Sequence, residues 1–163
     1  MARSTGDAGY VLMILVDTNV LSAMMRVAVE PAVERWFDSQ PSDSVWTTTV
    51  TIFEIRFGVA VLAPGRRRDR LYDAFDRAIN DILGGRVLPF DRTAAETAAA
   101  IAARQRQSGR AVEIRDVQIA AIAAARKATL ATRNTRHFEN LGIVLVDPWR
   151  ALQDTEKVFL PPL

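Results

Sequence analysis

Short runs of apolar residues alternate with longer segments in which apolar residues recur every three or four positions. The short runs are typical of strands, and the longer spacing is typical of helices that cover a sheet. The pattern predicts strands at residues 11–16, 45–48, 87–90, 129–132 and 143–146. It predicts helices at residues 20–26, 31–39, 50–62, 66–83, 93–107 and 115–127, and a short one before the last strand. Strands alternating with helices indicate an α/β protein, a three-layer α/β/α sandwich with a mostly parallel central sheet of about five strands.

Two details of the helical segments can be checked against a structure. Thr93 and Glu96 have the spacing of a capping box, so we expect the fifth helix to begin there. The third and fourth helices carry more apolar residues than one small core needs, namely Ile52, Phe53, Phe57, Leu62, Leu71, Phe75, Ile79 and Ile82. Core packing is one interpretation, and a face for a second copy or for an amphipathic partner segment is the other.

A chain of 163 residues is the size of one domain, and no linker divides it. We expect a tail at residues 1–12, a domain at residues 13–149 and a second tail at residues 150–163. No apolar run approaches the length that spans a bilayer, and the first residues lack the apolar segment of a secretion signal, so a soluble protein is predicted. Cysteine is absent, which excludes disulfides and thiolate metal sites and is compatible with the cytoplasm, the expected location.

The formal net charge of +2 is too small to indicate nucleic-acid binding by itself. The kind of basic residue is more informative, because 19 of the 21 are arginine. Guanidinium groups bind phosphate well, which favours a phosphate-containing ligand. Arginine use also follows genomic base composition, so that alternative stays open.

Oxygen-bearing side chains follow several of the predicted strands. Asp17 comes directly after the first strand, Glu54 lies in the helix after the second, and Asn134 comes shortly after the fourth. Ligands of parallel sheets bind at the carboxyl ends of the strands, so these groups are expected at one edge. Asp116 opens a later helix, where the helix dipole favours a carboxylate. Taken singly, each acid can be explained as a helix cap or an exposed helix acid, but their joint placement favours a site.

Six segments carry a resemblance to a known family. They are 13–20 (MILVDTNV), 51–58 (TIFEIRFG), 88–91 (LPFD), 116–121 (DVQIAA), 131–134 (ATRN) and 147–149 (DPW). In their order and spacing they resemble PIN-domain ribonucleases, and among these the VapC and FitB type toxins of toxin–antitoxin pairs. The resemblance extends from about residue 13 to residue 149.

The resemblance implies a homodimeric endoribonuclease toxin that hydrolyses RNA with Mg²⁺ or Mn²⁺ and is inhibited by a small cognate antitoxin with a DNA-binding domain. Asp17, Glu54 and Asp116 match the family's acidic, metal-binding positions. Asn134 stands where some members have a fourth acid, and we include it among the candidate catalytic residues. His137 occupies a position that is often Asp, so the loss of two carboxylates puts a second metal ion in doubt.

Elementary electrostatics agrees with a metal site. Three carboxylates brought close together repel one another and stay ionised together only around a multivalent cation. Mg²⁺ binds through few carboxylates and keeps several waters, which suits an open site. Thr18, Asn19 and Thr132 are candidates to hold the Asp17 carboxylate in place. The alternative is that Thr18 and Asn19 only begin a helix and Thr132 only ends a strand.

Other polar residues near this edge have two interpretations. Arg115, Arg133 and Arg136 can bind RNA phosphates or form salt bridges with the acidic group. His137 is either a partly exposed surface residue, which we favour, or a general base or an RNA contact. At the level of function, the alternative to a nuclease is a PIN-like module that binds RNA or a partner without cleavage. A nucleotide-binding signalling domain has little support, because no glycine-rich loop follows the first strand.

Overall fold

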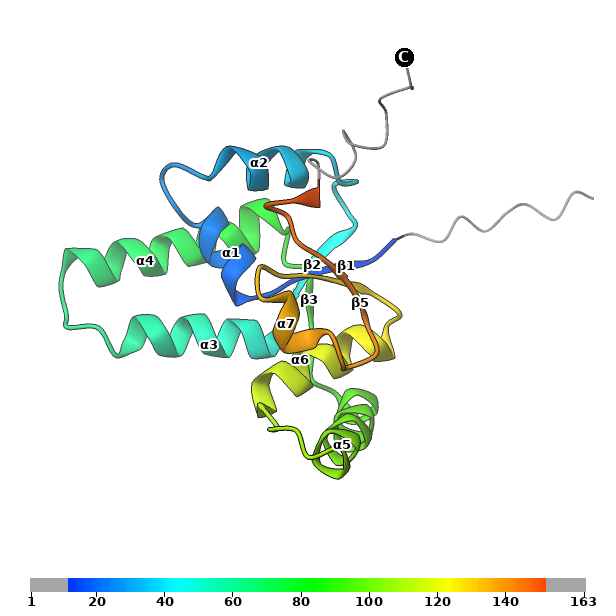
Figure 1. Cartoon of the computed structure of the whole chain (residues 1–163). Coiled ribbons are helices and arrows are strands. Elements are labelled where there is room, and N and C mark those ends of the chain that lie inside the picture. The colour runs from blue at the N-terminus through cyan, green and yellow to red at the C-terminus, as the bar shows by residue number, and fades with distance from the viewer. Residues whose placement is uncertain (1–11, 152–163) are drawn as a thin grey trace, which may run out of the picture.

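A five-stranded sheet forms the centre of the protein in a computed structural model, which describes residues 12–151 (Figure 1). All neighbouring strands are parallel, in the order β3-β2-β1-β4-β5. The strands are β1 (Ile14–Val16), β2 (Val45–Thr48), β3 (Val87–Leu88), β4 (Thr129–Ala131) and β5 (Val144–Val146). The predicted α/β/α architecture is therefore confirmed. Apart from residues 12, 150 and 151, the two predicted tails lie outside the described residues.

Helices cover both faces of the sheet. One layer holds α1 (Thr18–Met24), α2 (Pro31–Asp38), α3 (Thr49–Ala60), α4 (Arg66–Arg77) and the π-helix η1 (Ala78–Ile82). The other holds α5 (Arg92–Gln107) and α6 (Ile114–Ala125), and Figure 1 shows these two on the opposite side of the sheet from α2. The short α7 (Thr135–Phe138) connects β4 to β5. Within the described residues, no helix is long and apolar enough to cross a membrane.

The alternation of side chains along β1 divides the core in two. Ile14 and Val16 pack with the helices of the first layer, whereas Leu15 packs with α5 and α6. All three side chains are at most 2% exposed. A strand covered on both faces has no polar side, which explains why its sequence is a continuous apolar run.

Two helix boundaries differ from the prediction. The helix expected over 66–83 is present, but its last part, Ala78–Ile82, is a π-helix. The fifth helix begins before Thr93, because Asp91 is its N-cap and accepts a hydrogen bond from the Ala94 N–H at 2.9 Å. The capping-box prediction was wrong because Asp91 directly precedes the free N–H groups of the first turn and satisfies one of them itself.

Only some of the extra apolar residues predicted for the third and fourth helices pack in the core. Phe75 is 3% exposed, but Phe53 and Phe57 are 58% and 55% exposed, and Ile82 is 38% exposed. The Phe53 and Phe57 rings stack on each other with centroids 6.0 Å apart. Ile55 and Val59 of α3 enter one core cluster and Val50 enters the other, so Phe53 and Phe57 lie on faces of α3 that the core does not cover.

Candidate active site

Asp17 directly follows β1 and begins α1. Its Oδ1 accepts a hydrogen bond from the Val20 N–H at 3.0 Å, so the carboxylate caps the helix. Its Oδ2 accepts a hydrogen bond of 2.5 Å from the Thr132 hydroxyl, which follows β4. Asp17 is only 4% exposed. Asp17 can therefore be both a helix cap and a site residue, because one carboxylate oxygen accepts the helix N–H and the other accepts the Thr132 hydroxyl.

Burial raises the pKa of Asp17, because a carboxylate loses solvation in the interior. Hydrogen bonds from the Thr132 side chain and from the backbone N–H groups of Val20 and Asn19 oppose this by lowering the pKa, and the nearby Glu54 charge raises it further. The net direction is upward. A positive charge in front of Asp17 would relieve this penalty on the ionised form.

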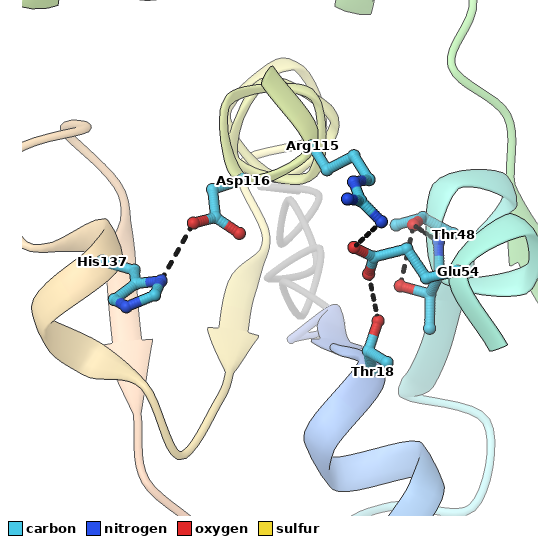
Figure 2. Close-up of polar contacts among 7 residues, drawn as sticks. Thr18, Thr48, Glu54, Arg115, Asp116 and His137 are labelled. Atoms are coloured by element: carbon cyan, nitrogen blue, oxygen red, sulfur yellow. Dashed lines mark hydrogen bonds and ion pairs between the residues drawn. The ribbon is translucent and has the colours of Figure 1, made fainter. Parts of the chain in front are cut away.

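Glu54 lies in the second turn of α3. The helix begins where it does because the Thr48 side chain, at the end of β2, accepts a hydrogen bond from the Thr51 N–H. The Thr18 hydroxyl donates to Glu54 Oε2, and Arg115 Nη1 lies 3.5 Å from Glu54 Oε1 (Figure 2). The Glu54 side chain is 19% exposed. Helices α1, α3 and α6 thus meet at this carboxylate, and Glu54 is not an ordinary exposed helix acid.

Asp116 lies in the first turn of α6, where the N-terminal dipole stabilises its negative charge. It is not the helix cap, which is Glu113. Asp116 Oδ2 lies 3.1 Å from His137 Nδ1 of α7, and Figure 2 shows this pair across from the Glu54 group. The His137 side chain is 56% exposed, and its contact with Asp116 was not expected.

Thr132 and Asn134 connect the end of β4 to the site. The Thr132 oxygen accepts a hydrogen bond of 3.0 Å from the Asn134 N–H while its hydroxyl hydrogen goes to Asp17. This arrangement fixes the Thr132 hydroxyl, and it supports the interpretation of Thr132 as a residue that holds Asp17. The Asn134 residue is exposed and reaches the same pocket.

One pocket of about 510 Å³ brings most of the predicted residues together, whereas Thr132, Arg133 and Arg136 are not among its lining. Its lining includes the three acids and the flanking polar residues: Asp17, Thr18, Asn19, Glu54, Glu113, Arg115, Asp116, Asn134 and His137. The sequence analysis missed Glu113, although it lies three positions before Asp116 and three positions make nearly one helical turn. We call this cavity the acidic pocket.

The donor chemistry of the acidic pocket fits a hard divalent cation, since carboxylate and amide oxygens are the ligands that Mg²⁺ and Mn²⁺ take. The side chains are nevertheless turned toward protein partners, as Figure 2 shows for Glu54 and Asp116. Among the described residues, no group of three or more acids or histidines is drawn together as a ready ligand set. Mg²⁺ keeps several waters and needs few direct protein ligands, so carboxylates spread around an open pocket still suit it.

The three candidate arginines have different surroundings. Arg115 pairs with Glu54, as the salt-bridge interpretation expected. The Arg133 guanidinium lies over the Trp149 ring, 4.9 Å from its centroid. Within residues 12–151, Arg133 and Arg136 have no carboxylate within ion-pair distance, so their charges remain available to a ligand.

Residues 14–144 match the PIN domain family. The chain is 39% identical over 139 residues to the plasmid stability protein StbB of Pseudomonas syringae, covering 85% of this chain and all of that protein. It is 36% identical to the VapC ribonuclease Y4jK of Sinorhizobium fredii over 84% of this chain and 98% of the relative. It is 34% identical to Toxin FitB of Neisseria gonorrhoeae over 84% and 99%, respectively.

The fold comparison agrees with the sequence comparison. The crystal structure of FitAcB from Neisseria gonorrhoeae superposes with a TM-score of 0.75 and 34% identity, covering 84% of this chain and 99% of that chain. The fold, the pocket at the carboxyl ends of the strands and these matches define the class, and the chain belongs to the PIN-domain family. Within it, the chain is similar to VapC and FitB type toxins over nearly the full length of those relatives.

Proposed function

We propose that the protein is the toxin of a toxin–antitoxin pair and an endoribonuclease that hydrolyses RNA phosphodiesters with Mg²⁺ or Mn²⁺. The observation that carries this proposal is the acidic pocket, in which Asp17, Glu54 and Asp116 arrive from three segments far apart in the sequence. The similarity to proteins named VapC ribonuclease and Toxin FitB supports it. We further propose a homodimer in the cytoplasm, inhibited by a small antitoxin with a DNA-binding domain.

Asp17, Glu54 and Asp116 would hold the cation, which when bound would activate a water molecule and neutralise charge on the phosphate. The chain's own groups set up this site. Thr132 and the Val20 N–H fix the Asp17 carboxylate, and Thr18 fixes that of Glu54. The Asn134 amide lines the same pocket and can donate a hydrogen bond to a phosphate oxygen.

Cleavage of a single-stranded RNA by the purified chain tests the proposal, with Mg²⁺, with Mn²⁺ and with EDTA. We expect Asp116→Asn to reduce the rate by at least about a hundredfold, the size of effect found when a group that stabilises transition-state charge is removed. Asp73→Asn is the matched control, because Asp73 is an exposed acid of α4 outside the pocket and the change in net charge is the same. Equal rates for the two variants would refute the nuclease assignment.

A second candidate function is binding of RNA or of a partner without cleavage. The partners already held by Glu54 and Asp116 favour it, as does the amide at Asn134 where an acid would strengthen a metal site. Titration of Mn²⁺ into wild type and Glu54→Gln by calorimetry separates the two functions. A nuclease site should bind the ion more weakly in the variant, whereas a module without a metal site should give the same trace for both proteins.

A further inference from the structure

A second cavity, of about 440 Å³, lies beside the acidic pocket. It is lined by Arg133, Asn134, Thr135, Arg136, His137, Asp147, Trp149 and Arg150. We call it the arginine pocket. Asn134 and His137 line both cavities, so the two are contiguous across α7.

The charge of the arginine pocket is opposite to that of its neighbour. Three arginines line it, and its acid is Asp147. That carboxylate is already engaged, since Oδ1 accepts the Trp149 N–H at 2.9 Å and Oδ2 lies 3.7 Å from Arg150 Nε. Arg133 and Arg136 are exposed and, in the part of the chain that the structure describes, are not neutralised by a carboxylate. The pocket therefore attracts an anion.

The pocket also contains a fixed aromatic plane. Trp149 Nε1 donates to Glu30 Oε2 at 2.6 Å, and the Trp149 backbone is held by Asp147, so the indole is fixed from two sides. The Arg133 guanidinium lies over this indole. A guanidinium held over an aromatic ring presents both an apolar surface and hydrogen-bond donors, which are the features that bind an unpaired base and its phosphate.

We propose that the arginine pocket binds a nucleotide of single-stranded RNA that flanks the phosphodiester held at the acidic pocket. Arg133 and Arg136 bind the flanking phosphate, and the stack of Arg133 on Trp149 supports the base. This assignment rests on the proposed function, which places RNA in the adjoining cavity. An acidic peptide is less suitable, because its carboxylates would gain nothing from the aromatic plane.

Binding of a fluorescently labelled single-stranded RNA, followed by anisotropy in EDTA at several salt concentrations, tests the assignment. We expect the double variant Arg133→Ala/Arg136→Ala to bind at least about tenfold more weakly, since a hydrogen bond to a charged group contributes roughly a factor of ten or more. The slope of log Kd against log salt should fall by about 0.7 for each phosphate that the variant no longer binds.

Arg104→Ala/Arg106→Ala is the matched control, because it removes the same number of charges. Both arginines are exposed residues near the end of α5, outside the arginine pocket. Equal affinities of the two double variants, or no RNA binding by the wild type, would overturn the assignment. Displacement of the RNA by an oligoglutamate of equal charge, from wild type but not from the pocket variant, would overturn it in favour of an acidic peptide.

The Trp149 part of the assignment has a separate readout. Bound RNA should quench the tryptophan fluorescence of the wild type more than that of Trp149→Phe, because a base held on the Arg133–Trp149 pair lies beside the indole and changes its emission. Equal quenching would overturn the placement of the base. All these measurements are made without divalent metal, so a failure to cleave RNA refutes the nuclease function without deciding whether the arginine pocket binds RNA.

Discussion

At the residue scale, Asp17 combines a structural role with a place in the acidic pocket. It caps α1 through Oδ1 and accepts the Thr132 hydroxyl through Oδ2 while almost completely buried. An ionised carboxylate in that position is poorly solvated, which is why its pKa is raised. The ionised Asp17 carboxylate therefore lowers the free energy of unfolding. The folded protein would be more stable with a neutral side chain at this position, but the site would lose the charge that it needs.

The raised pKa has a defined consequence for stability against pH. A folded-state pKa above the unfolded value means that the folded protein holds the proton more tightly, so the stabilisation is present at acid pH and is lost as the pH rises through the folded pKa. Asp17→Asn is neutral at every pH and still caps the helix. We expect its Tm in EDTA to exceed that of wild type at pH 7, and the difference to shrink on acidification.

Thermal unfolding followed by circular dichroism from pH 8 down to about pH 4, the ordinary pKa of an aspartate, measures this difference. Asp73→Asn is the control, because it removes one exposed carboxylate of α4 outside the acidic pocket. A wild type more stable than Asp17→Asn at pH 7 would mean that burial of the ionised Asp17 carboxylate does not destabilise the fold.

At the element scale, the starts of helices place the acids. Helix α3 begins where the buried Thr48 side chain accepts the Thr51 N–H at 3.0 Å, and this start sets the turn from which Glu54 faces α1 and α6. The Thr48 and Thr51 hydroxyl oxygens also lie 3.1 Å apart. A helix that began one residue later would rotate Glu54 by about 100°, away from the pocket.

Removal of the α3 cap should be measurable in the free energy of unfolding. Thr48→Ala leaves the Thr51 N–H without its partner, and we expect a loss of about 1 kcal/mol, within a range of roughly 0.5–2 kcal/mol. Thr48→Ser keeps the oxygen and also removes the methyl group, so it separates the cap from the packing. Urea unfolding at equilibrium gives both values, and equal losses for the two variants would show that the hydroxyl is not the stabilising group.

At the scale of the whole molecule, small side chains allow α6 to approach the sheet closely. Ala120, Ala121 and Ala123 have no exposed surface, and Ala120 lies in the same core as Leu15 of β1. This close packing brings the first turn of α6, with Asp116, to the strand ends where Asp17 and Glu54 lie. The packing of α6 against the sheet therefore helps to place Asp116 in the acidic pocket.

A larger side chain at this contact should destabilise the fold. We expect Ala120→Leu to lower the free energy of unfolding by about 1–3 kcal/mol, because the added atoms have no space in a closely packed layer. Ala125→Leu, on a partly exposed position of the same helix, is the control and should change stability little. An Ala120→Leu variant as stable as the control would mean that the layer has spare volume.

The sequence by itself determined the layers of the fold and the positions of the acids. Apolar runs and helical spacing are local properties, and a parallel sheet necessarily collects its carboxyl ends at one edge, so Asp17, Glu54 and Asn134 could be placed there. Only the tertiary structure decided which partner each of these side chains contacts. The hydrogen bond between Asp17 and Thr132 joins residues 115 positions apart, and that between Thr18 and Glu54 joins residues 36 positions apart. The pairing of Asp116 with His137 depends on how α7 packs next to α6.

The sequence alone also did not predict which apolar side chains are exposed or which residues meet on the surface. The exposure of Phe53 and Phe57, the π-helical end of α4 and the contact of Arg133 with Trp149 could not be predicted from spacing. Helical periodicity shows which residues share a face, but which face is covered depends on the packing of layers that are distant in the sequence. The chain thus determined which residues stand at the strand ends, and only packing in three dimensions decided the partner of each.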